Sequence, residues 1–158
     1  MNTLQFTKLN EKEVKNVVSA LEQLLADFQV YYTNLRGYHW NVKGKDFFVL
    51  HSQLEKMYDD IAEKVDEIAE RILMLGGTPT AKFSDYLKVT KLKEEGVVSC
   101  GDKILENILN TTSYFIECER NILSLASEAG DEVTVAIMGD YLKEQEKLVW
   151  MLVAQASK

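Results

Sequence analysis

The chain contains only two histidines, His39 and His51, and both lie near a group of acidic residues. His51 is followed by Glu55, Asp66 and Glu70 in a segment whose periodicity predicts one long helix. At about 100° per residue, these four side chains share one helix face, and the apolar residues fall almost opposite. Imidazole nitrogens together with carboxylates form a ligand set suited to a divalent metal such as iron. The pattern therefore predicts a metal site on this face.

Two simpler interpretations compete with the metal site. An acidic helix face is most often solvated charge, supported by Glu–Lys pairs at four-residue spacing. A lone histidine is most often a hydrogen-bonded structural residue. Here Lys56 and Lys64 fall elsewhere on the helical wheel. The acids near His51 are therefore expected to repel one another unless a cation is bound.

The axial spacing divides the acidic face into two pairs of residues. His51 and Glu55 lie about 6 Å apart along the axis, as do Asp66 and Glu70, and about 22 Å separates the pairs. One metal ion therefore cannot reach all four within one chain. Two copies of the helix packed antiparallel about a two-fold axis near residues 60 or 61 would form two identical sites. His39 would join each site from the end of the preceding helix.

The elements that must position these residues are helical. A single proline and eight glycines leave few breaks, and the 3.6-residue period predicts helices at about 10–41, 46–75, 100–129 and 131–155. Asp46 is the expected N-cap of the second helix, and Ser99 with Asp102 predicts a capping box for the third. The long middle link contains a short helix at about 83–89. We expect a single all-α domain over residues 1–158, a four-helix bundle with a ferritin-like crossover.

Composition restricts the classes of function. A net charge of −7 argues against nucleic-acid binding through bulk electrostatics. No apolar stretch approaches the length of a membrane span, and the first residues do not resemble a signal peptide, so we expect a cytoplasmic protein. Cys100 and Cys118 are expected to be free thiols, with a redox or ligand-binding role for Cys100 as the alternative.

Two stretches of the chain resemble the Dps family, the mini-ferritins also described as DNA-binding proteins from starved cells. They are NLRGYHWNVKGKDFFVLH at residues 34–51 and DEIAERILMLGGTP at residues 66–79. The resemblance continues in AGDEVT at residues 129–134 and EKLVWM at residues 146–151. It implies a homododecameric hollow shell, with iron-oxidising sites between subunits related by two-fold axes.

The resemblance also implies roles for individual residues. Trp40 corresponds to the aromatic residue beside the site, which can give an electron when peroxide is reduced. Glu55 stands where an aspartate is more usual, so its longer carboxylate reaches either the second iron or a bridging water. Zinc is a possible competitor for the same site. The implied ligands are His39, His51 and Glu55 from one subunit and Asp66 and Glu70 from the other.

Four further acidic residues are weaker candidates. Asp131 and Glu132 match the family's acidic pore, through which ferrous iron would enter. Their alternative role is to cap the fourth helix and interact with its dipole. Asp59 and Glu63 are candidates for mineral nucleation on the inner surface of the shell.

The expected function is oxidation of Fe(II) with hydrogen peroxide, preferred over oxygen, followed by storage of the ferric mineral. The alternative is a nucleoid-associated DNA-compacting protein with little ferroxidase activity. DNA-binding members of the family usually carry a basic tail, whereas Lys8 is the only basic residue before the first predicted helix, and the chain ends in Ser157-Lys158. We therefore expect DNA binding to be weak or absent. A purely structural helical assembly would leave the convergence of His39, His51 and Glu70 unexplained.

Overall fold

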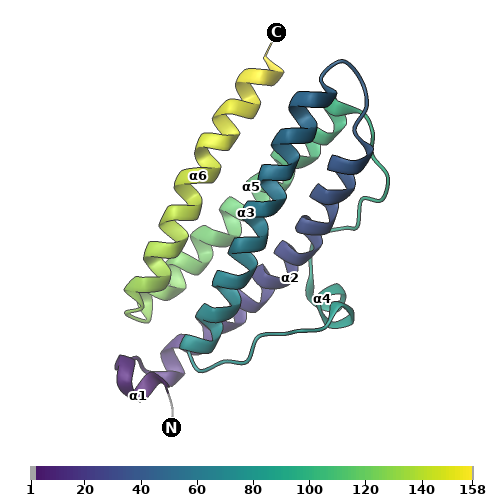
Figure 1. The fold of residues 1–158 in the computed structure, drawn as a ribbon. Coiled ribbons are helices and arrows are strands. Elements are labelled where there is room, and N and C mark those ends of the chain that lie inside the picture. The colour runs from purple at the N-terminus through teal and green to yellow at the C-terminus, as the bar shows by residue number, and fades with distance from the viewer. Residues whose placement is uncertain (1–2, 158) are drawn as a thin grey trace.

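Two antiparallel pairs of long helices form the body of the protein (Figure 1). The computed structural model describes residues 3–157, and these contain helices and no strand. The four long helices are α2 (Glu11–Asn41), α3 (Phe47–Met74), α5 (Gly101–Glu128) and α6 (Glu132–Ala156). α2 packs against α3, and α5 packs against α6, each pair joined by a short link. The predicted all-α ferritin-like bundle is confirmed.

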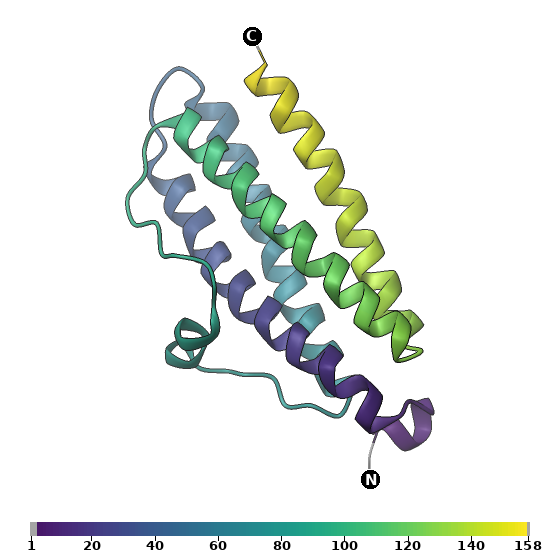
Figure 2. The same ribbon diagram turned by 180° about the vertical axis from the view of Figure 1, so that it is seen from behind.

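The crossover between the two helix pairs runs along the outside of the bundle. It carries α4 (Phe83–Val89), which lies beside α2 (Figure 2). Asp27 of α2 anchors the crossover, because its buried carboxylate accepts hydrogen bonds from Thr90 Oγ1 at 2.7 Å and from the Lys91 backbone N–H at 2.8 Å. Tyr114 Oη of α5 donates to the same carboxylate at 2.6 Å. This one buried acid therefore connects α2, the crossover and α5.

The five predicted helices lie within one or two residues of their expected bounds. The additional helix α1 (Thr3–Thr7) was not predicted, because five residues with one buried side chain, Leu4, show no measurable period. Asp46 is the N-cap of α3, as expected, but its side chain makes no capping hydrogen bond. α3 ends at Met74, one residue before its expected bound, and Gly76 follows with a φ of 79°, in the left-handed region that glycine tolerates.

The capping box predicted at the start of α5 is wrong. Cys100 is the N-cap, and its side chain makes no capping hydrogen bond. The Lys43 backbone N–H donates to the carbonyl oxygen of Ser99 at 3.0 Å, and an isolated parallel bridge pairs Lys43 with Cys100. This pairing holds the chain extended up to Cys100, so α5 begins one residue later than a Ser99 cap requires.

The apolar stripes of the four long helices meet in one core. Phe28 of α2 and Phe115 of α5 lie at its centre, with ring centroids 4.9 Å apart in an edge-to-face arrangement. Burial of these stripes fixes the rotation of each helix, and it therefore leaves the acidic face of α3 on the surface. Among residues 3–157, no helix is long and apolar enough to cross a membrane.

Candidate metal centre

The two histidines lie face to face where α2 and α3 are joined. His39 is near the C-terminal end of α2, and His51 is near the start of α3. Their ring centroids are 3.7 Å apart, and the ring planes are inclined by 20°. Gly44, with φ of 114°, allows the tight link between the helices. The prediction that the hairpin brings His39 to His51 is confirmed.

A reciprocal pair of hydrogen bonds fixes both imidazole rings. His39 Nδ1 lies 2.8 Å from the carbonyl oxygen of His51, and His51 Nδ1 lies 2.9 Å from the carbonyl oxygen of His39. His39 lies in the last turn of α2, where carbonyl oxygens have no partner within the helix. A carbonyl oxygen only accepts, so each Nδ1 must carry the proton in the neutral rings, and each Nε2 keeps a lone pair. Each histidine can therefore be a hydrogen-bonded structural residue through Nδ1 and a metal ligand through Nε2.

Aromatic side chains form the walls around the histidine pair. The ring of Phe47 stacks on His51 with centroids 5.0 Å apart, and the edge of Tyr58 meets His39 at 5.3 Å. His39 is 8% exposed, and His51 is only partly exposed. Tyr58 was not predicted as part of this site. The helical period does give a signal for it, since Tyr58 follows His51 by two turns and shares its face. These contacts fix the directions in which the two Nε2 lone pairs point.

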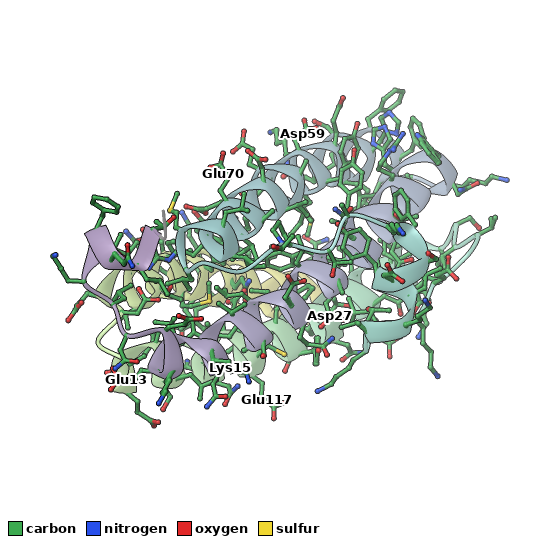
Figure 3. All side chains as sticks on the ribbon, turned by 90° about the horizontal axis from the view of Figure 1, so that it is seen from below. Glu13, Lys15, Asp27, Asp59, Glu70 and Glu117 are labelled. Carbon is green, nitrogen blue, oxygen red and sulfur yellow. The ribbon has the colours of Figure 1, made fainter. Side chains whose placement is uncertain are left out.

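The structure does not bring the second pair of ligand candidates to the histidines. Glu55, Asp66 and Glu70 are exposed on α3, and Figure 3 shows Glu70 at the surface of the bundle. Within the described part of a single chain, no group of three His, Cys, Asp or Glu side chains lies close enough to hold a metal ion. The histidine pair is therefore an incomplete site that needs further ligands.

An acidic hollow lies between α3 and α6. Its volume is about 530 Å³. Lys64 was expected to point away from the candidate ligand acids. Its ammonium group instead binds Asp60 at 2.6 Å and Glu144 at 2.7 Å, in agreement with that expectation. Asp59 is exposed on α3 but does not line this hollow. The acids that line the hollow are Asp60, Glu63, Asp66, Glu67, Glu70, Asp140 and Glu144.

Asp131 and Glu132 have different environments. Asp131 is 1% exposed, pairs with Arg71, and accepts a hydrogen bond from the Thr134 backbone N–H at 3.0 Å. The capping alternative is therefore correct for Asp131, and this buried carboxylate is not available to line a pore. Glu132 is exposed in the first turn of α6. The pore prediction now depends on Glu132 alone.

Trp40 is exposed rather than packed against the histidines. Its side chain is 63% exposed. The Arg36 guanidinium lies over its ring, 4.7 Å from the centroid. No aromatic ring contact joins Trp40 to either histidine in the part of the chain that the structure describes. The aromatic side chains in contact with the candidate ligands are Phe47, on His51, and Tyr58, on His39.

A second polar group lies inside the bundle and was missed in the sequence, because one acid on an apolar helix gives no pattern. Glu119 is fully buried, and burial raises its pKa to about 8. Gln145 Nε2 donates to its Oε1 at 2.6 Å, whereas Glu119 Oε2 has no partner among the described residues. Gln145 also lines a cavity of about 230 Å³. Cys100 and Cys118 are free, as expected.

Comparisons with known proteins agree with this architecture. Residues 18–158 match the ferritin-like domain family. The chain is 56% identical, over 98% of both sequences, to the DNA protection during starvation protein of Porphyromonas gingivalis. It is similar to the crystal structure of a Dps protein from Vibrio cholerae, with a TM-score of 0.92, 46% identity and 94% of each chain covered. That protein is described as a member of the ferritin-like diiron-carboxylate superfamily.

A more distant relative has the same fold. The antigen TpF1 of Treponema pallidum is 31% identical, with a TM-score of 0.91 over 94% of this chain and 96% of that one. The chain belongs to the Dps family of ferritin-like proteins.

Proposed function

We propose that the protein is a ferroxidase that oxidises Fe(II) at sites shared between two subunits and stores the product inside a homododecameric shell. The observation that carries this proposal is the histidine pair, whose Nδ1–H groups are committed to carbonyl oxygens and whose Nε2 lone pairs are free. Two nitrogen donors beside carboxylates suit ferrous iron, and zinc would compete for the same donors.

A second subunit would complete the site. Asp66 and Glu70 lie about 22 Å along α3 from His51 and Glu55, at 1.5 Å rise per residue. A two-fold axis across the middle of α3 would bring the first pair of one subunit to the second pair of the other. The exposed apolar side chains of the single chain support such burial, since Trp40, Phe48 and Trp150 are 63%, 84% and 67% exposed.

The five candidate ligands would have different roles in iron binding and oxidation. His39 and His51 hold the ferrous substrate on one side of the interface, with Glu55 beside them. Asp66 and Glu70 of the other subunit supply the negative charge that ferric products need. Two ferrous ions give one electron each to hydrogen peroxide, whose O–O bond breaks. Hydrolysis then yields ferric oxyhydroxide and releases four protons from two ferrous ions, one peroxide and two waters.

The acidic hollow between α3 and α6 would receive the product. Its carboxylates attract cations, and Lys64 neutralises only Asp60 and Glu144 among them. Glu63 is in this hollow, so it remains a nucleation candidate with its neighbours, and Asp59 is a candidate from the exposed face of α3. Glu132 remains the candidate for iron entry.

Anaerobic titration of the metal-free protein with Fe(II) and peroxide tests the function. We expect two ferrous ions to be consumed per peroxide, faster than with oxygen. The paired substitutions His39→Ala with His51→Ala, and Asp66→Asn with Glu70→Gln, should each abolish rapid oxidation. Glu117→Gln is the matched control, because this exposed acid lies on the opposite side of the bundle from Glu70 (Figure 3).

Mixing the two inactive paired variants tests whether the site is shared. Reassembled shells should regain part of the activity, because some interfaces then contain one complete site. No recovery in verified mixed shells would contradict a shared site. Light scattering should give about twelve times the 18.0 kDa chain mass, and a stable monomer would contradict the assembly.

A further inference from the structure

A cavity inside the bundle, which neither histidine lines, is formed by side chains of all four long helices of Figure 1. Its volume is about 230 Å³. An apolar cavity of about 150 Å³ is large enough to bind benzene. This cavity therefore has room for a benzene ring and a polar substituent. Its apolar walls are Met57, Ile61, Phe115 and Leu148.

Buried polar atoms without a hydrogen-bond partner gather at this cavity. Among residues 3–157, the buried side-chain atoms of this kind are Tyr31 Oη, Gln145 Oε1 and Glu119 Oε2. Tyr31 and Gln145 line the cavity and are only 4% and 9% exposed. Glu119 does not line it but is joined to it, because Gln145 Nε2 donates to Glu119 Oε1 at 2.6 Å. Since buried polar groups are nearly always hydrogen-bonded, their gathering at one cavity indicates a polar ligand.

The types of these atoms define the group that would satisfy them. Gln145 Oε1 only accepts, so it needs a donor, whereas the Tyr31 hydroxyl both donates and accepts. The hydroxyl of Thr112 is a neighbour of Tyr31, but its proton goes to the carbonyl oxygen of Ile108 at 2.8 Å, so Thr112 cannot donate to Tyr31. A hydroxyl group on a ligand can donate to Gln145 and accept from Tyr31 at the same time.

The charged residues that line the cavity cancel one another. Lys64 bridges α3 and α6 by binding Asp60 at 2.6 Å and Glu144 at 2.7 Å, and both carboxylates are partly exposed to solvent. Lys56 is the other lysine in the lining, and it is exposed. Two lysines and two acids leave no net charge. A charged ligand would therefore lose its hydration without meeting an opposite charge, which favours an uncharged one.

Aromatic walls favour an aromatic ligand. The rings of Tyr31 and Phe115 meet edge to face with centroids 5.2 Å apart, and this contact also fixes the position of the Tyr31 hydroxyl. Aromatic rings and methionine sulfur both make favourable contacts with a further aromatic ring. Met57 and Phe115 supply these contacts in the lining.

We propose that this cavity is a binding site for a small uncharged phenol. The phenol hydroxyl donates to Gln145 Oε1 and accepts from Tyr31 Oη, and its ring lies against the apolar walls. Binding here needs neither iron nor a second subunit, so this inference is independent of the ferroxidase proposal.

Titration calorimetry of the assembled, metal-free protein with p-cresol at neutral pH tests the proposal. We expect one site per chain with a Kd below about 1 mM. Toluene is the matched ligand, because it has the same ring and methyl group without the hydroxyl. It should bind about tenfold more weakly, which corresponds to one or two net hydrogen bonds. Equal affinity for p-cresol and toluene, or no saturable binding of p-cresol, would refute the site.

The variant Tyr31→Phe removes one hydroxyl and keeps the ring against Phe115. It should weaken p-cresol binding by roughly three- to tenfold and leave toluene binding unchanged. Tyr32→Phe is the matched control, because Tyr32 is the next residue of α2 and does not line the cavity. The control should bind p-cresol like the unaltered protein. Unchanged p-cresol affinity in Tyr31→Phe would contradict the proposed contacts.

A crystal soaked with 4-bromophenol gives a second measurement that needs no variant. The anomalous signal of bromine should lie inside the bundle, with the phenol hydroxyl within hydrogen-bond distance of Tyr31 Oη and Gln145 Oε1. Bromine found only in the neighbouring apolar groove, which is lined by Val49, Leu105 and Met151, would refute the assignment. Saturable p-cresol binding in a protein that fails to oxidise iron would refute the ferroxidase function and leave this site standing.

Discussion

Replacement of Glu119 by glutamine should change how stability depends on pH. The side chain is fully buried in α5, and burial raises its pKa from 4.5 to about 8. Below pH 4.5, both the folded and the unfolded chain hold the proton. Between pH 4.5 and 8 the unfolded chain releases it while the folded chain keeps it, so stability falls as the pH rises. Glutamine is neutral at every pH, nearly the same size, and still able to accept from Gln145.

The size of this effect follows from the shift in pKa. At 1.36 kcal/mol per unit, Glu119→Gln should gain about 4–5 kcal/mol per chain relative to the unaltered protein at pH 8 and about 1 kcal/mol at pH 5. For a chain of this length, each kcal/mol corresponds to roughly 2–4 °C in Tm, so the gap at pH 8 should be about 10 °C or more.

The assay is thermal unfolding at pH 5, 6.5 and 8 with both proteins at the same concentration, since assembly makes Tm concentration-dependent. Infrared spectroscopy of the protonated carboxyl group gives a direct check. Glu117→Gln, two residues earlier and exposed, is the control and should show no such pH-dependent gain. Parallel pH profiles for Glu119→Gln and the unaltered protein would refute the reasoning.

Three other predictions concern the start of α6 and the surface charge. Asp131→Ala leaves Arg71 buried without its partner and removes a helix cap, so it should destabilise the chain by about 3–5 kcal/mol in denaturant unfolding; a loss below about 1 kcal/mol would contradict this account. Glu132→Gln should slow iron uptake at low salt with Tm nearly unchanged, whereas lower Tm with normal uptake would indicate a capping role. Duplex DNA should show no gel shift at about 150 mM salt without divalent cations, and submicromolar metal-independent binding would contradict the charge argument.

The helices could be predicted from the sequence because their signal is local. Apolar residues repeat with the helical period, and Gly76 and Gly130 follow α3 and α5 closely. The cap of α5 was predicted wrongly because a pairing between Lys43 and Cys100, distant in sequence, decides where that helix begins. The helix α1 escaped prediction because it is too short to show a period.

The candidate site could be predicted only in part. His51, Glu55, Asp66 and Glu70 belong to one helix, so their shared face and axial spacing follow from residue number alone. His39 needed a second helix to fold back on α3, and the hairpin confirms its position. Which imidazole nitrogen remains free could not be predicted, because two carbonyl oxygens on different helices decide it.

The sequence by itself determined the helical architecture, the donor chemistry and the spacing that separates the ligand pairs, because these depend on residue type and on the rise of one helix. Only the tertiary structure decided which carboxylates are exposed and charged, and so available to bind a metal ion. Asp131 is buried on Arg71, Glu119 keeps a proton inside the bundle, and Glu70 remains exposed. Carboxylates of similar chemistry differ in role because burial and ionic partners come from neighbouring helices, and these govern charge and access.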